Sequence, residues 1–214
     1  MLLSNYCSPS WCSYAEFYSK RLQFKKDCII FSVGQKTEGI FIITSGFVKI
    51  TKKTNDNEER IIRLAKKDDF VGHRGFGGNW TYTVTANALS DVEVLFLPLQ
   101  IYTDLVVSNP NFAVFMLDFF ANELRESEHL ANQLPIRNKI AWVLIKTLET
   151  FGWDENSSAL NYTLSRKDLA SMAGTRYETL IRTLAEFNKE KLIENIGKNI
   201  HILNLPQLQK EAGI

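Results

Sequence analysis

The segment from Leu164 to Leu184 reads LSRKDLASMAGTRYETLIRTL, and its spacing predicts two helices joined by a tight turn. Ser165 followed by Asp168 forms a capping box that opens a short helix. Gly174 supplies the turn, and Thr175 followed by Glu178 forms a second box that opens a longer helix. This order is typical of a helix-turn-helix motif. The apolar residues expected to face the core are Leu169, Ala170, Met172, Leu180, Ile181, Leu184 and Phe187.

The residues after this motif predict a wing. Residues 192–196 and 200–203 are short apolar segments, and Gly197, Lys198 and Asn199 stand between them as a hairpin tip. A helix-turn-helix followed by a hairpin indicates a winged helix.

A winged helix suggests which side chains contact double-stranded DNA, because the second helix of the motif enters the major groove at its N-terminal end. Arg176 and Arg182 can donate two hydrogen bonds to guanine, and Glu178 can accept one from cytosine. Each residue also has a simpler interpretation: Glu178 as a helix cap, Arg182 as an exposed helical charge and Lys198 as a solvated turn residue. The residues expected at bases are Arg176, Tyr177, Glu178, Thr179 and Arg182, and those expected at phosphates are Ser165, Arg166, Thr179 and Lys198.

A long helix is expected upstream, between Pro110 and Pro135. Apolar and small residues recur along it at alternating steps of four and three, which is a heptad seam that needs a partner. We therefore expect a homodimer, while Phe112, Phe115 and Phe119 on an adjacent face should pack on the chain's own core. A second amphipathic helix is expected over residues 136–151. The seam consists of Ala113, Leu117, Phe120, Leu124, Ser127, Ala131 and Leu134.

Between Cys28 and Pro98 the chain runs in short β-branched segments separated by turn residues. Many short strands at near-even spacing predict an antiparallel barrel or roll. The segments are CIIFSV, GIFIIT, GFVKIT, RIIRLA, YTVTANAL and VEVLFLP, with a hairpin tip at residues 55–59. The expected fold is α+β, with an N-terminal antiparallel β-roll over 1–108, a dimerisation helix and hinge over 109–135, and a winged-helix DNA-binding domain over 136–214.

Composition narrows the classes of protein. The chain has 214 residues and a net charge of +1, which neither demands nor excludes a nucleic-acid partner. It has no secretory signal and no apolar run of about 18 residues, so a soluble cytoplasmic protein without a membrane partner is expected. Cys7, Cys12 and Cys28 are an odd set without export signals, which argues against a disulfide framework. A redox or iron-sulfur role stays open, although such clusters usually take four ligands.

The chain resembles the bacterial transcription regulators of the cyclic-AMP receptor protein and fumarate-nitrate regulator (Crp/Fnr) family. The resemblance rests on GIFIITSGFVK at 39–49, DFVG at 69–72 and the segment 164–184. It implies a cyclic-nucleotide-binding-like jelly roll, a homodimer and, for an activator, RNA polymerase as a partner. Glu178 and Arg182 stand where family members read bases. Tyr177 stands where many members have Arg or a small residue, so the operator sequence is left open.

The same resemblance places the family's effector pocket at GHRGFGGNWTYTVTA, residues 72–86. Nucleotide-responsive members carry a Glu where this chain has His73, and an Arg-Ser or Arg-Thr pair where it has Tyr82 and Thr83. Losing an Arg-phosphate pair removes a strong bidentate interaction, which argues against cyclic AMP as the effector. Arg74 could hold another anion or form an internal salt bridge with Asp68 or Asp69. Either Gly72, His73, Arg74, Tyr82 and Thr83 bind a different ligand, or the protein's own side chains fill the pocket.

Three other functions remain as alternatives. An oxygen or redox sensor would use the N-terminal cysteines, and would need at least one further ligand to hold an iron-sulfur cluster. A ligand-binding scaffold would not bind DNA at all. An enzyme is disfavoured because the sequence shows no nucleophile with its base, no catalytic residues and no metal-ligand cluster. The effector, the target genes and the direction of regulation are not assigned by the sequence.

Overall fold

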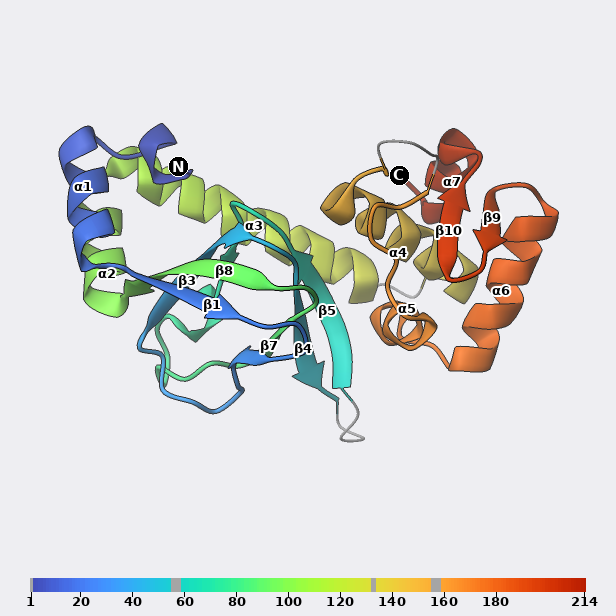
Figure 1. The fold of residues 1–214 in the computed structure, drawn as a ribbon, viewed down its shortest axis with the longest axis horizontal. Coiled ribbons are helices and arrows are strands. Elements are labelled where there is room, and N and C mark those ends of the chain that lie inside the picture. The colour runs from blue at the N-terminus through green and yellow to red at the C-terminus, as the bar shows by residue number, and fades with distance from the viewer. Residues whose placement is uncertain (1, 55–58, 132–133, 155–158) are drawn as a thin grey trace. The chain divides into compact units, whose positions relative to one another are not determined.

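The computed structural model describes residues 2–54, 59–131, 134–154 and 159–214 (Figure 1). Two compact units make up the chain, Met1–Lys53 with Ala65–His129 and Thr54–Leu64 with Leu130–Ile214. None of the helices in the described ranges is both long enough and apolar enough to cross a membrane. The expected hairpin tip at residues 55–59 lies almost entirely outside the described residues.

Antiparallel β-sheets form the N-terminal roll, which confirms the predicted fold class. Within the described residues one sheet has the order β1 (Lys20–Phe24), β8 (Val92–Pro98), β3 (Gly39–Ser45) and β6 (Phe70–Val71). The other has the order β2 (Ile29–Phe31), β7 (Thr85–Ala88), β4 (Val48–Lys53) and β5 (Glu59–Ala65).

All six predicted segments contain a strand, whereas β1 and β6 were not predicted. The segment from Tyr82 was expected to be extended throughout, but its strand begins only at Thr85. The backbone of Tyr82 instead exchanges hydrogen bonds with Gly34 and Gln35, at 2.8 and 2.9 Å, so it pairs with the turn that follows β2.

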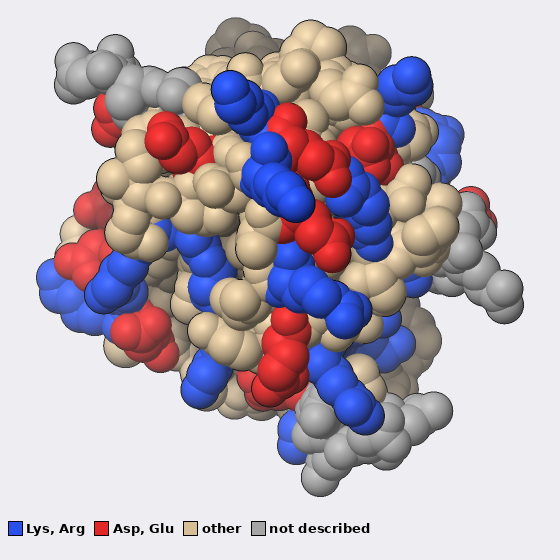
Figure 2. All heavy atoms as spheres, turned by 90° about the vertical axis from the view of Figure 1, so that its right-hand side faces the viewer, with Lys and Arg blue, Asp and Glu red and all other residues tan. Residues whose placement is uncertain are grey.

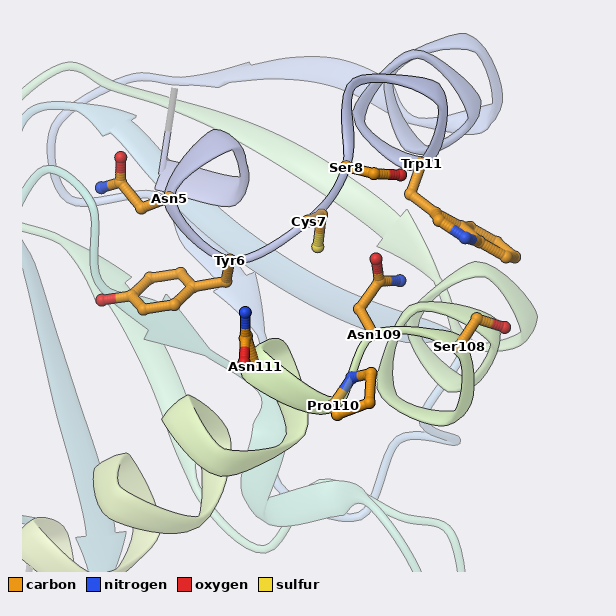
Figure 3. A pocket seen from close by; sticks show the side chains of 9 residues that line it. All are labelled: Asn5, Tyr6, Cys7, Ser8, Trp11, Ser108, Asn109, Pro110 and Asn111. Atoms are coloured by element: carbon orange, nitrogen blue, oxygen red, sulfur yellow. The ribbon is translucent and has the colours of Figure 1, made fainter.

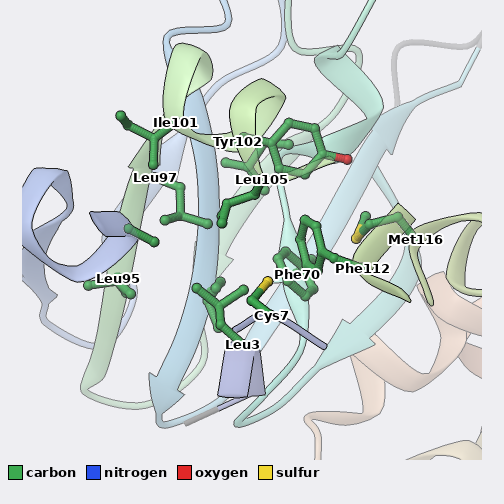
Figure 4. Close-up of a cluster of buried hydrophobic side chains, with 13 residues drawn as sticks. Leu3, Cys7, Phe70, Leu95, Leu97, Ile101, Tyr102, Leu105, Phe112 and Met116 are labelled. Atoms are coloured by element: carbon green, nitrogen blue, oxygen red, sulfur yellow. The ribbon is translucent and has the colours of Figure 1, made fainter. Parts of the chain in front are cut away.

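Helices cover the sheet that contains β3, which explains why β3 is buried along most of its length. Besides the short η1 (Leu2–Asn5), this layer consists of α1 (Pro9–Tyr18), α2 (Leu99–Ser108) and the start of α3 (Pro110–Ala131). Their side chains form one apolar cluster with the strands (Figure 4). Neither α1 nor α2 was predicted. The cluster contains Ile40, Ile42, Phe70, Leu95, Leu97, Ala15, Ile101, Tyr102, Leu105, Phe112 and Met116, together with Leu3 and Cys7.

The predicted long helix is α3, and two of its faces differ in environment. Phe112 is fully buried and Phe115 and Phe119 pack against the cluster, as expected. Leu117 and Leu124 are 70% and 60% exposed. Leu134 was predicted to continue the helical seam, but it lies outside the helix, which ends at Ala131. Leu134 precedes Pro135, and a residue before proline disfavours helical backbone angles.

The C-terminal unit is built around α4 (Ile136–Phe151), whose bounds match the prediction. Residues 140–145 of α4 are all buried, because α5 (Arg166–Ala173), α6 (Tyr177–Lys189) and α7 (Leu205–Ala212) pack against this helix. The wing consists of β9 (Ile193–Ile196) and β10 (Asn199–Ile202), as predicted. Helix α7 was not predicted, although Asn204 caps it by accepting a hydrogen bond from the Gln207 amide, a signal that is readable from sequence.

Candidate nucleic-acid interface and effector region

The first helix of the motif begins as predicted. The Ser165 hydroxyl accepts a hydrogen bond from the Asp168 amide at 3.0 Å and donates one to the Asp168 carboxylate at 2.8 Å. Gly174 ends this helix in the left-handed region, with φ of 64°, which a residue with a side chain adopts at a cost. Because both sides of the Ser165 hydroxyl are used in the cap, its predicted role as a phosphate donor would require breaking the cap.

The second capping box was predicted wrongly. Helix α6 begins at Tyr177, with Arg176 as its N-cap and no side-chain cap. The Thr175 amide instead donates to the Ala170 carbonyl, which keeps Thr175 in the turn. Glu178 is therefore exposed in the first turn and is not a capping partner of Thr175.

Helix α6 has one apolar face and one polar face. Leu180, Leu184 and Phe187 are buried at steps of four and three. Ile181 was expected to face inward, but it lies a quarter turn away and is 39% exposed. On the outer face Arg176, Tyr177, Glu178 and Arg182 are exposed and Thr179 is half-buried. The structure thus brings the predicted base-contacting residues together at one end of one helix.

Charges of both signs lie on the side of the C-terminal unit that carries α6. Figure 2 shows Lys and Arg side chains interspersed with Asp and Glu side chains on this face. The surface is therefore not a uniformly basic patch, and the mild overall charge of the chain reflects this mixture.

Arg166 and Lys198, the other predicted phosphate contacts, have different surroundings. Lys198 is exposed at the tip of the wing. Arg166 is half-buried, and its guanidinium donates to the Asn195 side chain at 3.0 Å and to the Lys198 carbonyl at 3.4 Å. Burial lowers the pKa of Arg166. Arg166 is therefore directed at the wing of its own chain.

A second arginine, Arg137 at the start of α4, was not singled out from the sequence. It pairs with Glu190 at 2.6 Å and with Glu211 at 2.9 Å, and its guanidinium lies 4.6 Å from the centre of the Phe187 ring. Hydrogen bonds to these carboxylates raise the pKa of Arg137, so it stays charged. The pairs join α4 to the C-terminal end of α6 and to α7. Their partners lie about 50 and 70 residues away along the chain, so local sequence patterns carry no signal of them.

The effector-region turn begins at Gly72, whose φ of 88° lies in the left-handed region, and continues as η2 (His73–Gly75). His73 is only 3% exposed, and its Nε2 lies 2.8 Å from a Glu123 carboxylate oxygen on α3. The Arg74 Nε donates to the same oxygen at 3.1 Å. Arg74 thus forms an internal salt bridge, with Glu123 rather than the suggested Asp68 or Asp69. The rings of Phe119 and Phe120 pack edge-on against His73.

Tyr82 lies inside the roll, whereas its neighbour Thr83 is exposed. The Tyr82 hydroxyl donates to the Gly39 carbonyl at 2.8 Å, and its ring stacks on Phe31 with centroids 4.2 Å apart. A Cβ added at Gly72 would come within 3.2 Å of the Tyr82 ring. The five predicted pocket residues therefore diverge: Gly72 and Tyr82 pack together, His73 and Arg74 contact α3, and Thr83 faces solvent.

The cysteines lie in unlike settings. Cys7 borders a pocket of about 390 Å³, lined by residues 5–8, Trp11 and residues 108–111 (Figure 3). Burial, together with the nearby Cys12 thiol, raises the pKa of Cys7 to about 11. Cys28 is exposed, and no group of three or more His, Cys, Asp or Glu residues in the described part of the chain is arranged to hold a metal.

Comparison with known proteins accounts for both units. A model of the cyclic nucleotide-binding domain matches residues 21–109, and a model of the Crp-like helix-turn-helix domain matches residues 138–211. The chain belongs to the Crp/Fnr family of transcription regulators. This Crp/Fnr regulator is 23% identical, over 91% of its length and 90% of the relative's, to a CRP-like cAMP-activated global transcriptional regulator of Mycobacterium tuberculosis. It is 25% identical to the transcriptional activator protein anr of Pseudomonas aeruginosa, over 94% and 84% of the two chains.

Solved structures confirm the fold of this Crp/Fnr regulator. FixK2 from Bradyrhizobium japonicum superposes with a TM-score of 0.77 at 19% identity, covering 90% of this chain and 96% of that one. The c-di-GMP responsive regulator CLP from Xanthomonas campestris superposes with a TM-score of 0.75 at 18% identity, covering 91% and 99%. The confirmed architecture is an α+β chain with an antiparallel β-roll, a long helix and a C-terminal helix-turn-helix domain.

Proposed function

We propose that this regulator is a homodimer that reads a specific DNA sequence with the N-terminal end of α6, under the control of an effector other than cyclic AMP. The observation that carries the proposal is the outer face of α6, where Arg176, Tyr177, Glu178 and Arg182 are exposed. Their helix is held from behind by buried Leu180, Leu184 and Phe187. A rigid helix with exposed donors and acceptors is what direct base readout in the major groove requires.

Within this proposal each exposed residue has a role. Arg176 and Arg182 donate to guanine edges, and Glu178 accepts from cytosine. Tyr177 offers an aromatic ring for contact with thymine methyl groups or the sugar-phosphate backbone. Thr179 and Lys198 bind phosphates, which fixes the register of the helix on the duplex.

The exposed face of α3 supports the homodimer. Leu117 and Leu124 are 70% and 60% exposed, and Phe120 between them is 37% exposed. These residues occupy alternating heptad positions, and burying them against a second copy would remove apolar surface from water. A two-fold dimer presents two copies of α6 to half-sites spaced about 10 base pairs apart. The structure does not describe the side chain of Ala131, which was also predicted in this seam.

We divide the chain functionally into a β-roll over 1–108, a dimerisation helix and hinge over 109–135, and a DNA-binding domain over 136–214. The boundary between the hinge and the DNA-binding domain is placed at Pro135, the N-cap of α4. Helix α4 then begins at Ile136 and passes through the centre of the C-terminal unit.

The effector region argues against cyclic AMP. The Tyr82 ring fills the space beside Gly72, and no arginine stands at position 82 or 83 to hold a cyclic phosphate. Arg74, the nearest cation, is engaged by Glu123. A cyclic nucleotide would have to displace a stacked aromatic ring and break an internal ion pair before binding. An effector that acts here must bind with different affinities to two conformations of the protein, which differ in the contact between η2 and α3.

The test begins with selection of duplexes from a random pool by the purified full-length protein, followed by footprinting and sedimentation. We expect a two-fold symmetric site and a dimer. Leu124→Glu should give a monomer and weaken operator binding at least about a hundredfold, because the second half-site contact is lost. Val107→Glu is the matched control, since Val107 is 77% exposed but lies on α2, away from the seam.

Three outcomes would overturn parts of the proposal. Failure to enrich any duplex over the random pool would contradict sequence-specific binding. A Leu124→Glu protein that stays dimeric would contradict the seam. Cyclic AMP that raises the thermal midpoint or operator affinity would contradict the effector assignment, because a ligand of the folded state stabilises it by mass action.

A further inference from the structure

The wing is a small structure whose outer part has little apolar anchoring. Strands β9 and β10 are four residues each, and residues 194–199 are all exposed. Ile193 and Ile202 are buried at its base, and Ile200, which pairs with Asn195 nearer the tip, is buried as well. A two-stranded hairpin is at best marginally stable by itself. Beyond the buried Ile200 and the hydrogen bond that the Leu160 amide donates to the Ile200 carbonyl, the position of the wing tip therefore depends on contacts with the neighbouring helices.

Three hydrogen bonds, made by two helix side chains, join the outer wing to the two helices of the motif. From the start of α5, Arg166 reaches Asn195 on β9 through one guanidinium nitrogen and the Lys198 carbonyl through another, at 3.0 and 3.4 Å. From the end of α6, the Asn188 side-chain oxygen accepts a hydrogen bond from the backbone N–H of Asn195 at 3.1 Å. Asn195 is thus held from both helices at once. Among the described residues, these are the helix side chains that hydrogen-bond to residues 194–199.

We infer that Arg166 is a positioning residue that orients the wing and the Lys198 side chain relative to α6, rather than a residue that itself binds DNA phosphate. Its forked guanidinium matches two acceptors that face it, the Asn195 amide oxygen and the Lys198 carbonyl. The positive charge offered to DNA at this corner is then that of Lys198, on the exposed tip. This assignment reverses the role that the sequence suggested for Arg166.

The inference rests on the proposed DNA-binding function for its consequence, but its structural part can be tested in the free protein. Four full-length variants are compared: Arg166→Gln, Asn195→Ala, the double variant and Arg166→Lys. Lys167→Gln is the matched control, because Lys167 is the neighbouring cation on α5 and is exposed. Amide hydrogen exchange over residues 194–200 should speed up about fivefold in both single variants, the ratio that one net hydrogen bond gives. The double variant should add little to either, and α6 amides should stay protected.

Binding to the selected operator separates positioning from phosphate contact. Arg166→Gln and Asn195→Ala should each weaken binding about three- to tenfold and combine non-additively, because they break the same contact. The slope of log affinity against log salt should stay unchanged in both, whereas Lys198→Gln should reduce it by about 0.9, as loss of one phosphate contact does. Arg166→Lys should not rescue binding, since an ammonium group cannot reproduce the fork.

The opposite pattern would overturn the inference. A phosphate contact would make Arg166→Gln lower the salt slope by about 0.9, let Arg166→Lys restore binding, and leave Asn195→Ala silent. Unchanged wing exchange in Arg166→Gln would also contradict it. If the wild-type protein enriches no duplex, the DNA-binding function itself fails, while the exchange experiment still decides whether Arg166 holds the wing.

Discussion

Two turns of the molecule use similar residues and place them oppositely. After Gly72, with φ of 88°, the chain sets His73 and Arg74 against Glu123 of its own α3. After Gly174, with φ of 64°, it sets Arg176 and Tyr177 toward solvent at the start of α6. Burial, not residue type, separates the two. The first turn makes contacts within its own unit, and the second leaves its side chains exposed for the DNA that we propose as their partner.

The largest expected difference between the two regions concerns a pair of tyrosines. Tyr82→Ala should lower the free energy of unfolding of the first unit by about 3–5 kcal/mol, because it removes a buried, stacked ring. Tyr177→Ala should change stability by less than about 0.5 kcal/mol, because Tyr177 is 46% exposed. Hydrogen exchange of β3 and β8 amides reports the first unit, and that of α4 amides the second. If Tyr82→Ala and Tyr177→Ala lowered the free energy of unfolding equally, the Tyr82 ring would not be filling a packed site.

A pair of glutamates tests the same contrast through charge. Glu123→Gln should lower the stability of the first unit by about 1.5–3 kcal/mol, since hydrogen bonds to a charged group are lost at a site where His73 is 3% exposed. Glu178→Gln should leave stability within about 0.5 kcal/mol and change only the preference for one base. The measurement is the same exchange experiment, joined to binding of the selected operator. A Glu123→Gln protein as stable as the wild type would show that the contact between Glu123 and η2 contributes little to the stability of the first unit.

A pair of arginines comes next, and here the larger effect is on binding. Arg182→Ala should weaken operator binding by about 1–3 kcal/mol and relax specificity at one base pair, with random duplexes affected less. Arg74→Ala should leave base preference unchanged and lower stability by no more than about 1 kcal/mol, because its side chain is 29% exposed. Equal losses on operator and random DNA for Arg182→Ala would contradict base reading.

The last comparison is between two cysteines, Cys7 and Cys28, and it concerns their chemical reactivity rather than stability. With its pKa raised to about 11, Cys7 has about one thiol in a thousand ionised at pH 8. Its alkylation by iodoacetamide should be slow and should rise about tenfold per pH unit up to that pKa, while exposed Cys28 reacts first. Mass spectrometry of the labelled peptides checks the order. Rapid labelling of Cys7 at pH 7 would revive its candidacy as a redox sensor.

Much of the fold was predictable because its signals are local. Short β-branched segments between turn residues located six strands of the roll, the bounds of α4 matched, and the Ser165 cap was found from two residues. The errors came where local signals conflicted with tertiary contacts. Thr175 resembles a cap, but its amide bonds to Ala170 in the turn. Tyr82 has strand-like neighbours, but its backbone bonds to Gly34 and Gln35.

The sequence by itself determined the order of the β-roll, the long helix and the winged helix, together with the residues on the outer face of α6, because capping, periodicity and turn chemistry act over a few residues. Only the tertiary structure decided that Glu123, 50 residues from His73, meets the effector-region turn, and that Arg166 faces the wing. Such contacts depend on how elements pack. Packing is cooperative across the whole unit, so no short stretch of sequence specifies which polar groups become partners.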